Sequence, residues 1–503
     1  MQRAITRSES AMASAFTFTL LLENIAPFSI PNISQTRLSV FSRSYPSRIV
    51  WIRNLRPHHS LGIAAAIFLV DTLILSRYFE PVDSKTDLYR SIENYAFDEA
   101  LVGRHMVFLA GPRQVGKTRL ARGRLARAGC SPLYFNWDDP ITRRSYLLDP
   151  RFFESPARSV EQEDPWIVFD EIHKRPRWRD ILKGIYDSFG DEFRFLITGS
   201  ARLDLFRRSG DALVGRYSLF HMLPLSLCEA VGSPRKSCFL AGNAPDAVAT
   251  ALAQEVEVKA DTLTHDACHA LLRFGPFPEP FLRQNDRFSR IWHRDYISLI
   301  VREELRDISR VVELDKLENL VMLLPSRVSS PLSMPNLAGE LEAAHTTVKK
   351  WLEQLRRLYL VFPVAPWHKK VSRGLKKGKK WYFLDWTYAP EGGSRQENMV
   401  AAALYRTCMM LTDMGIGDYS LHYLRTLDRR EIDFIVSREG RPLLAVEVTS
   451  GDTLLAGSLE NRVKWFPDDM PAAIQAVTPP GILQKHPNHT WVMSLHRLMS
   501  LLL

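Results

Sequence analysis

The sequence predicts an α/β fold that contains a parallel sheet with helices on both faces. Between residues 102 and 198, short apolar segments alternate with helix-forming segments, and this alternation is typical of parallel sheets. The apolar segments are nearly continuous, as expected for strands that are buried on both faces. The chain has 503 residues, 46% of them hydrophobic, which is enough for several globular domains.

Four strands and one helix are expected in this part of the chain. The first strand covers residues 102–110, and a glycine-rich turn joins it to a helix at 118–128 that is rich in Ala, Leu and Arg. The other strands are expected at 133–137, 166–169 and 194–198, each bounded by turn residues or acids.

The turn after the first strand contains the most specific motif of the sequence. Residues 111–118 read Gly-Pro-Arg-Gln-Val-Gly-Lys-Thr and match the phosphate-binding pattern G-x-x-x-x-G-K-[ST]. Glycines let the backbone fold around phosphates so that its N–H groups point inward, and the next helix presents its positive amino terminus. A chance match is the alternative, and the strand–turn–helix context argues against it. The motif predicts binding of ATP with Mg²⁺ by Gly111, Pro112, Arg113, Gln114, Val115, Gly116, Lys117 and Thr118.

Roles within this motif follow from the chemistry of its side chains. The Lys117 ammonium would reach the β- and γ-phosphates, and the Thr118 hydroxyl would ligate magnesium. A second motif, Trp-Ile-Val-Phe-Asp-Glu at residues 166–171, is an apolar strand that ends in two acids. Asp170 would hold magnesium through water, and Glu171 would act as the general base for hydrolysis. Two acids at a strand end often only cap the next helix, but their position behind the phosphate-binding loop predicts an ATPase.

Three further polar residues are candidates for the same site. Thr198 ends the strand at 194–198 and Ser200 lies just beyond it, where a hydroxyl would sense the γ-phosphate; capping of a helix is the alternative. Arg216 is the candidate for a catalytic arginine that stabilises negative charge, in cis or in a neighbouring subunit. An ordinary surface salt bridge is the alternative for Arg216.

These motifs together resemble a large prokaryotic family of AAA-type P-loop ATPases. The resemblance rests on the loop at 111–118, Phe-Asp-Glu-Ile-His-Lys, Ile-Thr-Gly-Ser-Ala-Arg, and Gly-Arg-Tyr with Leu-Pro-Leu-Ser, in this order, and extends from about Ser76 almost to the last residue. Members of the family carry a carboxy-terminal, DUF4143-like region of unknown function. The resemblance implies an ATPase core, a winged helix and a carboxy-terminal fold similar to restriction-endonuclease-like nucleases.

Three acids in the last part of the chain form a candidate second site. Asp433 and Glu447 lie on two expected strands joined by a turn, and Glu397 lies on a preceding helix. This layout resembles nucleases in which such carboxylates hold magnesium and activate water. Thr449 stands where those nucleases have lysine, and a hydroxyl cannot supply the missing charge. We therefore expect a degenerate domain; an active nuclease and a set of merely solvated acids are the alternatives.

The segment before this domain is a candidate for DNA contact. Two amphipathic segments at 337–341 and 346–358, followed by apolar residues 360–362, suit a helix-turn-helix with a wing. Protein contact or domain packing is the alternative, and Trp351 and Leu355 are expected in the core. The residues that could face DNA are Thr346, Thr347, Lys349, Lys350, Gln354 and Arg356, with added phosphate contacts from Lys369, Lys370, Arg373, Lys376, Lys377, Lys379 and Lys380.

Net charge, cysteine spacing and hydrophobicity limit which kinds of site and cellular location the sequence supports. A net charge of +10 is modest for this length, and the five widely spaced cysteines include no C-x-x-C pair, so neither zinc nor a disulfide framework is indicated. The apolar residues 61–75 are fewer than the roughly 20 that cross a membrane and include Asp71. We expect a cytoplasmic protein without a transmembrane helix.

The expected domains are a poorly defined extension at 1–75, a P-loop ATPase domain at 76–235, a helical region at 236–328, a winged helix at 329–380 and a restriction-endonuclease-like domain at 381–503. The leading hypothesis is an ATPase that couples its nucleotide state to a carboxy-terminal effector module. A nucleotide-dependent DNA-binding protein with little turnover is the alternative, and a metal-dependent nuclease is less favoured. The expected cofactors are ATP and Mg²⁺; the candidate partners are duplex DNA, a protein activator and further copies of the chain.

Overall fold

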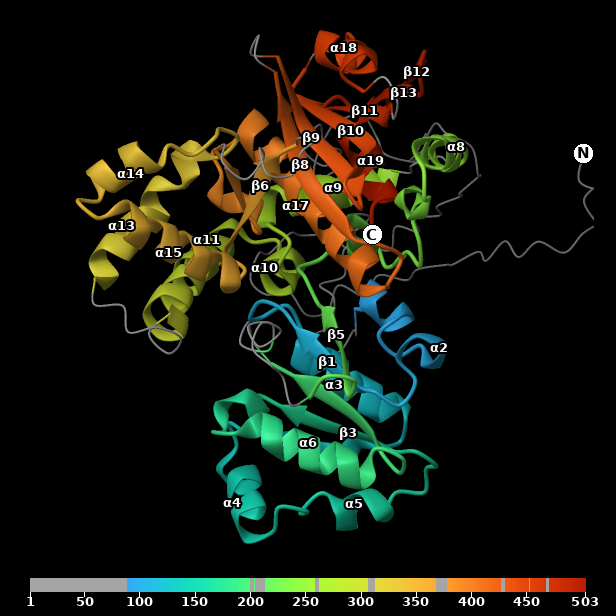
Figure 1. Cartoon of the computed structure of the whole chain (residues 1–503), viewed down its shortest axis with the longest axis vertical. Helices are drawn as coiled ribbons and strands as arrows, with labels where there is room; N and C mark the ends of the chain where they lie inside the picture. Colours follow the sequence, from blue (N-terminus) through green and yellow to red (C-terminus); the bar gives the residue numbers. More distant parts are fainter. Residues whose placement is uncertain are drawn as a thin grey trace, which may run out of the picture. The chain divides into compact units, whose positions relative to one another are not determined.

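The structure is a computed structural model that describes residues 88–199, 203, 213–257, 262–305, 313–367, 378–426, 430–451, 453–466 and 470–503. The chain divides into two compact units, Met1–Glu80 and Pro81–Leu503. The described residues all belong to the second unit, which Figure 1 shows coloured along the sequence. The expected extension at 1–75, with its apolar residues 61–75, lies outside them.

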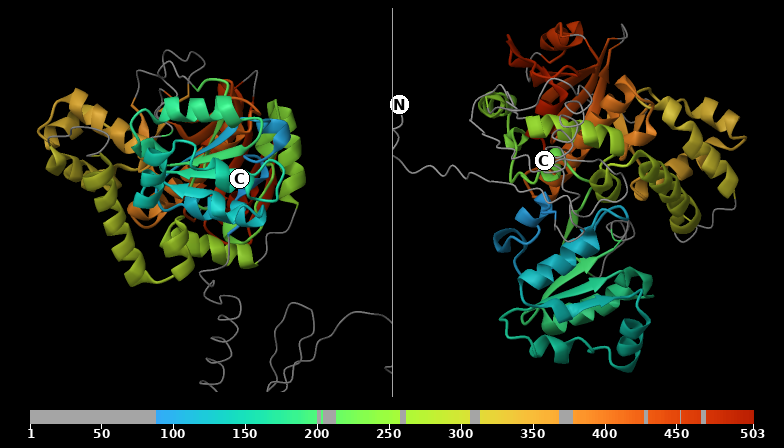
Figure 2. Two further views of the ribbon diagram at one scale, coloured as in Figure 1. Left: turned by 90° about the horizontal axis from the view of Figure 1, so that it is seen from below. Right: turned by 180° about the vertical axis from the view of Figure 1, so that it is seen from behind.

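A five-stranded parallel sheet forms the first layer of this unit, and it confirms the predicted α/β class. The strand order is β2-β3-β4-β1-β5, and every neighbouring pair is parallel. Figure 2 shows this sheet from below and from behind. The strands are β1 (Met106–Ala110), β2 (Tyr134–Asn136), β3 (Trp166–Asp170), β4 (Arg194–Thr198) and β5 (Tyr217–His221).

Two features of this sheet differ from the prediction. The expected strand at 102–110 begins only at Met106, because the residues before it form helix α2 (Glu99–Val102), which the Asp98 side chain caps by accepting from the Ala100 N–H. Strand β5 was not predicted. Its sequence, Tyr-Ser-Leu-Phe-His, mixes polar and apolar residues because β5 is an edge strand that pairs only with β1.

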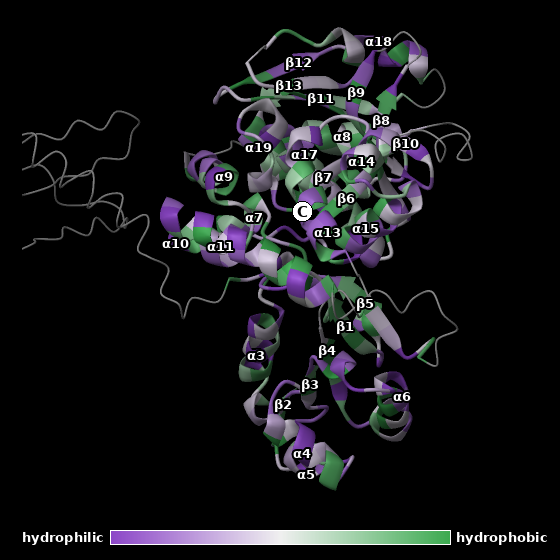
Figure 3. Cartoon of the chain, turned by 90° about the vertical axis from the view of Figure 1, so that its left-hand side faces the viewer, coloured by the Kyte–Doolittle hydropathy of each residue, from purple (hydrophilic) through white to green (hydrophobic). Residues whose placement is uncertain are grey.

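Helices cover the sheet and close its apolar core. The helix after the glycine-rich turn, α3 (Lys117–Arg127), packs against β3 and β4, and Trp178 of α6 (Trp178–Phe189) contacts Phe108 of β1. Strand β1 is entirely buried, and its hydrophobic residues appear green in Figure 3. Two shorter helices complete the layer, α4 (Pro140–Leu148) and α5 (Glu154–Arg158).

A helical region follows, as the sequence predicts. One of its helices, α11, continues into a π-helical turn, η6 (Leu299–Glu304). The α-helices are α7 (Leu227–Ala230), α8 (Pro245–Val256), α9 (Thr262–Phe274), α10 (Pro278–Arg283), α11 (Asp286–Ser298) and α13 (Leu314–Leu323).

The last part of the chain contains a mixed sheet of eight strands in the order β12-β13-β11-β10-β9-β8-β6-β7. Two helices, α14 (Met334–Glu340) and α15 (His345–Arg357), precede the hairpin of β6 (Val361–Pro366) and β7 (Lys380–Phe383). Strand β6 also pairs with β8, so the hairpin belongs to the same sheet as the carboxy-terminal strands. These are β8 (Tyr419–Arg425), β9 (Glu431–Arg438), β10 (Arg441–Thr449), β11 (Ala472–Val477), β12 (Leu483–His486) and β13 (Thr490–Ser494).

The longest helix, α17 (Gly393–Asp413), packs against this mixed sheet and also contacts β5 of the parallel sheet. Two shorter helices, α18 (Gly457–Trp465) and α19 (Leu495–Leu501), lie near the carboxy-terminal strands. All five cysteines are buried thiols. Within the described ranges, no helix has the length and apolar character that a membrane span requires.

Candidate nucleotide-binding site

The loop between β1 and α3 has a backbone that only its glycines allow. Gly111 has φ +147°, and a Cβ atom there would lie 2.2 Å from the carbonyl oxygen of Met222. Gly116 precedes α3 with φ +100°. The neighbouring chain holds the loop in place, since Arg90 donates to the Val115 carbonyl at 2.7 Å. The loop therefore has the close, preset curvature that a phosphate-binding turn needs.

Lys117 is buried at the start of α3, with an exposed fraction of 8%. Its ammonium donates to the carbonyl oxygens of Gly111, at 2.9 Å, and Pro112, at 2.6 Å. Burial lowers the pKa of Lys117 to about 8, although the carboxylates of Glu171 and Asp170 oppose this shift. A phosphate group at the loop would give this ammonium an anionic partner in place of two neutral carbonyls.

Asp170 lies at the end of β3, next to the loop, and is almost fully buried. It accepts hydrogen bonds from the hydroxyls of Thr118, at 2.8 Å, Tyr134, at 2.5 Å, and Thr198. The structure thus brings together Thr118 and Asp170, the two residues expected to hold magnesium. Their oxygen atoms are ligands that Mg²⁺ prefers, so the residues present fit this ion. Tyr134 was missed by the sequence analysis, because a tyrosine on a short strand carries no signal of its own.

Glu171 follows β3 in the left-handed conformation, with φ +59°. Its carboxylate lies 3.2 Å from the ammonium of Lys174 and 3.5 Å from Nε2 of His173. Burial raises the pKa of Glu171, while the positive charge of Lys174 opposes the change. A raised pKa makes a carboxylate a better general base near neutral pH, as a role in activating water requires. The unusual backbone costs energy of order 1–3 kcal/mol and directs this side chain beside Asp170.

A cavity of about 820 Å³ opens beside these residues. The predicted loop lines it together with Asp170 and Glu171. Glu279 of α10 and Leu299 of η6 also line the cavity, so the helical region forms one of its walls. Asn136, the last residue of β2, and Asp138 after it also line the cavity and were not predicted. Polar residues at the carboxyl end of a parallel strand are a signal that could have found them.

Two of the predicted residues do not join this site. Arg216 directly precedes β5, and its carbonyl accepts from the N–H of Met106 at the start of β1. It therefore lies at the amino-terminal edge of the sheet, about 16 Å along the strands from the loop, and it pairs with Asp187 at 2.7 Å. This position does not fit the expected role in cis. The pair with Asp187 is an exposed salt bridge, the alternative for Arg216, and a role in a neighbouring subunit stays a prediction. Ser200 lies outside the described residues.

Two of the three candidate acids of the last domain, Glu397 and Asp433, pair with a buried lysine. The ammonium of Lys380 lies 3.5 Å from Glu397 and 3.9 Å from Asp433, and it forms a further ion pair with Glu431. Lys380 has an exposed fraction of 1%, so its expected surface contact with phosphates is wrong. No group of three or more His, Cys, Asp or Glu side chains in the described part of the chain could hold a metal ion. The described residues thus show no metal-binding group at the candidate site of Glu397, Asp433 and Glu447.

The pKa values of this cluster follow from its burial. Burial and the neighbouring carboxylates of Glu447 and Glu397 raise the pKa of Asp433 well above its usual range. Burial raises the pKa of Glu447 to about 7. The pKa of Lys380 is also raised: burial alone would lower it, but the attraction of the carboxylates is larger. The cluster thus contains the cation that Thr449 does not provide, supplied from another strand.

Two models of known protein families match separate parts of the chain. Residues 103–231 match the family model of an AAA domain, and residues 265–388 match that of a domain of unknown function, DUF8612. The second match is not the DUF4143-like region that the sequence resemblance implied, so that part of the resemblance is not confirmed.

Related proteins and solved structures also match much of the chain. The uncharacterized protein Rv2008c of Mycobacterium tuberculosis is 23% identical over 352 residues, which cover 67% of this chain and 68% of that protein. The uncharacterized protein MJ1637 of Methanocaldococcus jannaschii is 26% identical over 337 residues, 62% of this chain and 67% of its own. The Aeropyrum pernix ORC1 protein in complex with DNA matches with a TM-score of 0.27 and 14% identity, over 59% of this chain and 86% of that one.

This TM-score is too low to carry an argument. The evidence for a nucleotide-binding domain is therefore the AAA-domain match and the geometry of the loop. Both concern the same residues: the match begins just before β1 and includes the glycine-rich loop, Asp170 and the five parallel strands. Residues 103–231 of this chain therefore match an AAA domain, and the match includes a glycine-rich loop with the close curvature of a phosphate-binding turn.

Proposed function

We propose that this protein is a Mg²⁺-dependent ATPase whose nucleotide state controls its helical and carboxy-terminal regions. The observation that carries the proposal is the contact between the Thr118 hydroxyl and Asp170, at 2.8 Å, on the wall of a cavity that also exposes Lys117 and Glu171. These four side chains provide a phosphate ligand, two magnesium ligands and a base within one site.

Each residue then has one task in hydrolysis. The N–H groups of the loop and the Lys117 ammonium bind and orient the phosphates. Thr118 and Asp170 would hold Mg²⁺, which supplies positive charge against the phosphate oxygens. Glu171 accepts the proton of the attacking water, and the neighbouring Lys174 keeps its carboxylate in place.

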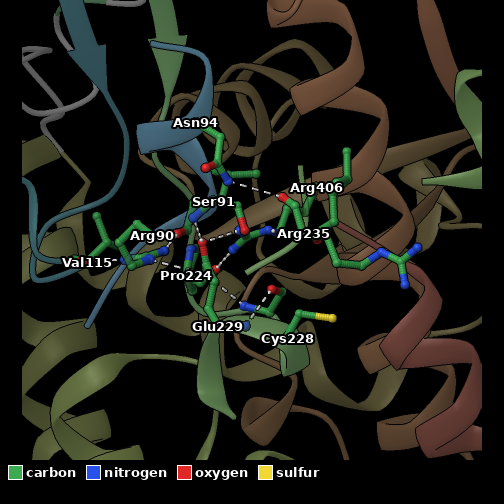
Figure 4. A network of polar contacts seen from close by, with 12 residues as sticks. Arg90, Ser91, Asn94, Val115, Pro224, Cys228, Glu229, Arg235 and Arg406 are labelled. Carbon is green, nitrogen blue, oxygen red and sulfur yellow. Dashed lines mark hydrogen bonds and ion pairs between the residues drawn. The ribbon is translucent and has the colours of Figure 1, made fainter. Parts of the chain in front are cut away.

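A chain of buried contacts supports coupling between the loop and the carboxy-terminal region. Arg90, which donates to the loop at Val115, also pairs with Glu229 at 3.1 Å. Glu229 pairs in turn with Arg406 of α17 at 2.7 Å. Figure 4 shows these three side chains in contact. A second contact joins the end of β5 to the end of α17, where Nδ1 of His221 lies 2.9 Å from Asp413. Movement at the loop would therefore be transmitted to α17.

The test is Mg²⁺-dependent ATP hydrolysis by the full chain. We expect Lys117→Ala to lose ATP binding, and Glu171→Gln to keep it while turnover falls by about 100-fold or more, as for the loss of a general base. Glu192→Gln, the same substitution at an exposed acid paired with Arg158, should behave like the wild type. Equal turnover in Glu171→Gln and the wild type would show that this residue is not the base.

The exposed face of α15 favours a second candidate, a nucleotide-dependent DNA-binding protein. Lys349 and Lys350 are exposed on this helix, whereas Trp351 and Leu355 are buried. If both lysines contact phosphates, replacing them with glutamine should reduce the slope of log affinity against log salt by about 2. Duplex binding that is independent of salt and of these lysines would exclude the candidate.

Adding or withholding duplex DNA in the ATPase assay compares the two functions. Turnover that rises with DNA would indicate a DNA-coupled ATPase. Nucleotide binding without turnover, unaffected by DNA, would instead indicate a switch that requires a protein activator or a neighbouring copy of the chain. If a neighbouring copy is the activator, the oligomer should hydrolyse ATP and Arg216→Ala should reduce that turnover, because Arg216 lies at the opposite edge of the sheet from the loop of its own chain.

A further inference from the structure

A buried acid from the helical region contacts the phosphate-binding loop. Glu304 is the last residue of η6, the π-helical turn that continues α11, and its exposed fraction is 3%. Its carboxylate forms an ion pair with Arg113 of the loop. π-Helical turns are rare and occur often at functional sites, and this one places a negative charge against the loop that has to bind phosphates.

Arg113 lies where its guanidinium group could bind either the Glu304 carboxylate or a phosphate group in the cavity. Its side chain is about one-third exposed and lines the nucleotide cavity, together with Lys117 and Thr118. The carboxylate of Glu304 pairs with the same guanidinium group. A guanidinium group binds phosphate oxygens in the same bidentate way as it binds a carboxylate, so a bound polyphosphate and Glu304 would compete for it.

We propose that Glu304 is a positioning residue of the nucleotide site, which holds Arg113 until ATP binds and then releases it to the phosphates. This inference rests on the proposed function only in requiring that the site binds ATP. Glu304 neither touches the nucleotide nor takes part in hydrolysis. It acts through Arg113 and sets how much of the binding free energy is used to break the ion pair.

The release has a consequence for the helical region. A carboxylate that loses its counter-ion cannot stay buried without large cost, so the segment at 299–305 must rearrange to bring Glu304 to a new hydrogen-bond donor. The Tyr296 hydroxyl, about two helical turns before Glu304, is a donor of this kind. It is buried and has no hydrogen-bond partner among the described residues. Burial raises the pKa of Tyr296 above its usual range, and the charges of Asp385, Glu304 and Arg113 also affect it.

The experiment measures MgATP affinity by calorimetry in the full chain and in Glu304→Gln, which keeps the shape of the side chain and removes its charge. We expect the variant to bind MgATP about tenfold more tightly, equivalent to about 1.4 kcal/mol, because no carboxylate competes for Arg113. The matched control is Glu318→Gln, since Glu318 pairs with Arg302 of the same turn at 2.7 Å but does not reach the loop. Its affinity should equal that of the wild type.

The direction in which the MgATP affinity of Glu304→Gln changes distinguishes competition for Arg113 from a purely structural role of Glu304. Damage to packing at Glu304 would weaken nucleotide binding, so unchanged or weaker binding by a folded Glu304→Gln would overturn the proposal. A wild type that shows no Lys117-dependent ATP binding would instead refute the proposed function itself. The two failures are therefore distinguishable.

A second measurement needs no variant and applies even if Glu304→Gln does not fold. Amide hydrogen exchange at residues 299–305 is compared in the wild type with and without MgATP. We expect exchange there to become faster with MgATP, because Glu304 loses its partner, while the segment at 314–323 stays unchanged. Equal exchange in both states would show that nucleotide does not release Glu304.

Discussion

The substitution Glu229→Gln tests the buried contact between the phosphate-binding loop and α17. Glu229 has an exposed fraction of 1% and pairs with two guanidinium groups, those of Arg90 at 3.1 Å and Arg406 at 2.7 Å. It also accepts from the N–H of Ser91 at 2.7 Å. Removing its charge leaves two buried arginines without their counter-ion, whereas glutamine keeps the size of the side chain.

Two arguments give the expected loss of unfolding free energy in Glu229→Gln. Breaking a buried ion pair by removing one partner costs about 3–5 kcal/mol. Burial by itself would raise the pKa of Glu229, but the two arginines are the larger effect and lower it from 4.5 to about 2. A pKa lowered by that amount corresponds to about 3 kcal/mol of stabilisation of the charged form. We therefore expect Glu229→Gln to lower the free energy of unfolding by about 3 kcal/mol at pH 7.

The sign of the pH dependence provides a further check. Because the folded-state pKa is lowered, the contribution of Glu229 is complete above pH 4.5 and is lost as the pH falls towards 2. The measurement is guanidinium-induced unfolding at several pH values, followed by tryptophan fluorescence. The difference between the wild type and Glu229→Gln should be largest at pH 7 and shrink below pH 4.5.

The control for this prediction is Glu255→Gln. Glu255 also pairs with an arginine, Arg235, but about a quarter of each side chain is exposed. Solvent screens such a pair, so the expected loss is below about 1 kcal/mol. A loss of less than about 1 kcal/mol for Glu229→Gln as well would refute the argument that this contact is a strong link between the two regions.

Three further predictions follow from the same structure. The affinity for MgATP should fall as the pH is raised from 7 to 9.5, because Lys117 has a pKa of about 8 and must be protonated to bind phosphate; calorimetry that finds constant affinity would contradict this. Gly111→Ala should lose ATP binding and about 2 kcal/mol or more of stability, since its Cβ would meet the Met222 carbonyl at 2.2 Å; normal binding and melting would exclude the clash. Lys380→Met should destabilise the protein by about 3 kcal/mol at pH 8 and by less at pH 5, where the carboxylates that lose their cation can take up protons; an equal loss at both pH values would argue against an ionic role.

The residues that line the candidate nucleotide cavity could be predicted from the sequence, because their chemistry is local. Glycines, Lys117 and Thr118 are consecutive, and their spacing is set by the backbone that must enclose a phosphate. Asp170 and Glu171 could be added because they end an apolar strand. The predicted parallel sheet is confirmed for the same reason: its strands are continuous apolar segments, and only the mixed edge strand β5 was missed.

The predictions that failed depend on contacts between distant parts of the chain. Arg216 seemed suitable by type, but the direction of β5 places it at the wrong edge of the sheet. Lys380 belongs to a basic run and was expected on the surface, yet three acids from α17 and β9 surround it. Glu304 has no sequence signal, since its importance comes only from its contact with Arg113. Sequence patterns report strand ends and loops, but they do not report which side chains meet across the fold.

The shared sheet has a consequence for dividing this protein into modules. The hairpin of β6 and β7 covers β8, and β6 pairs with β8 at Ala365 and Pro366. Removing 329–380 as a unit, or exchanging it between relatives, would leave one edge of β8 unpaired, because β9 covers only the other edge, and unpaired strand edges promote aggregation. Strands β6 and β8 therefore have to be kept in the same fragment. A cut between residues 380 and 381 would pass through β7 itself.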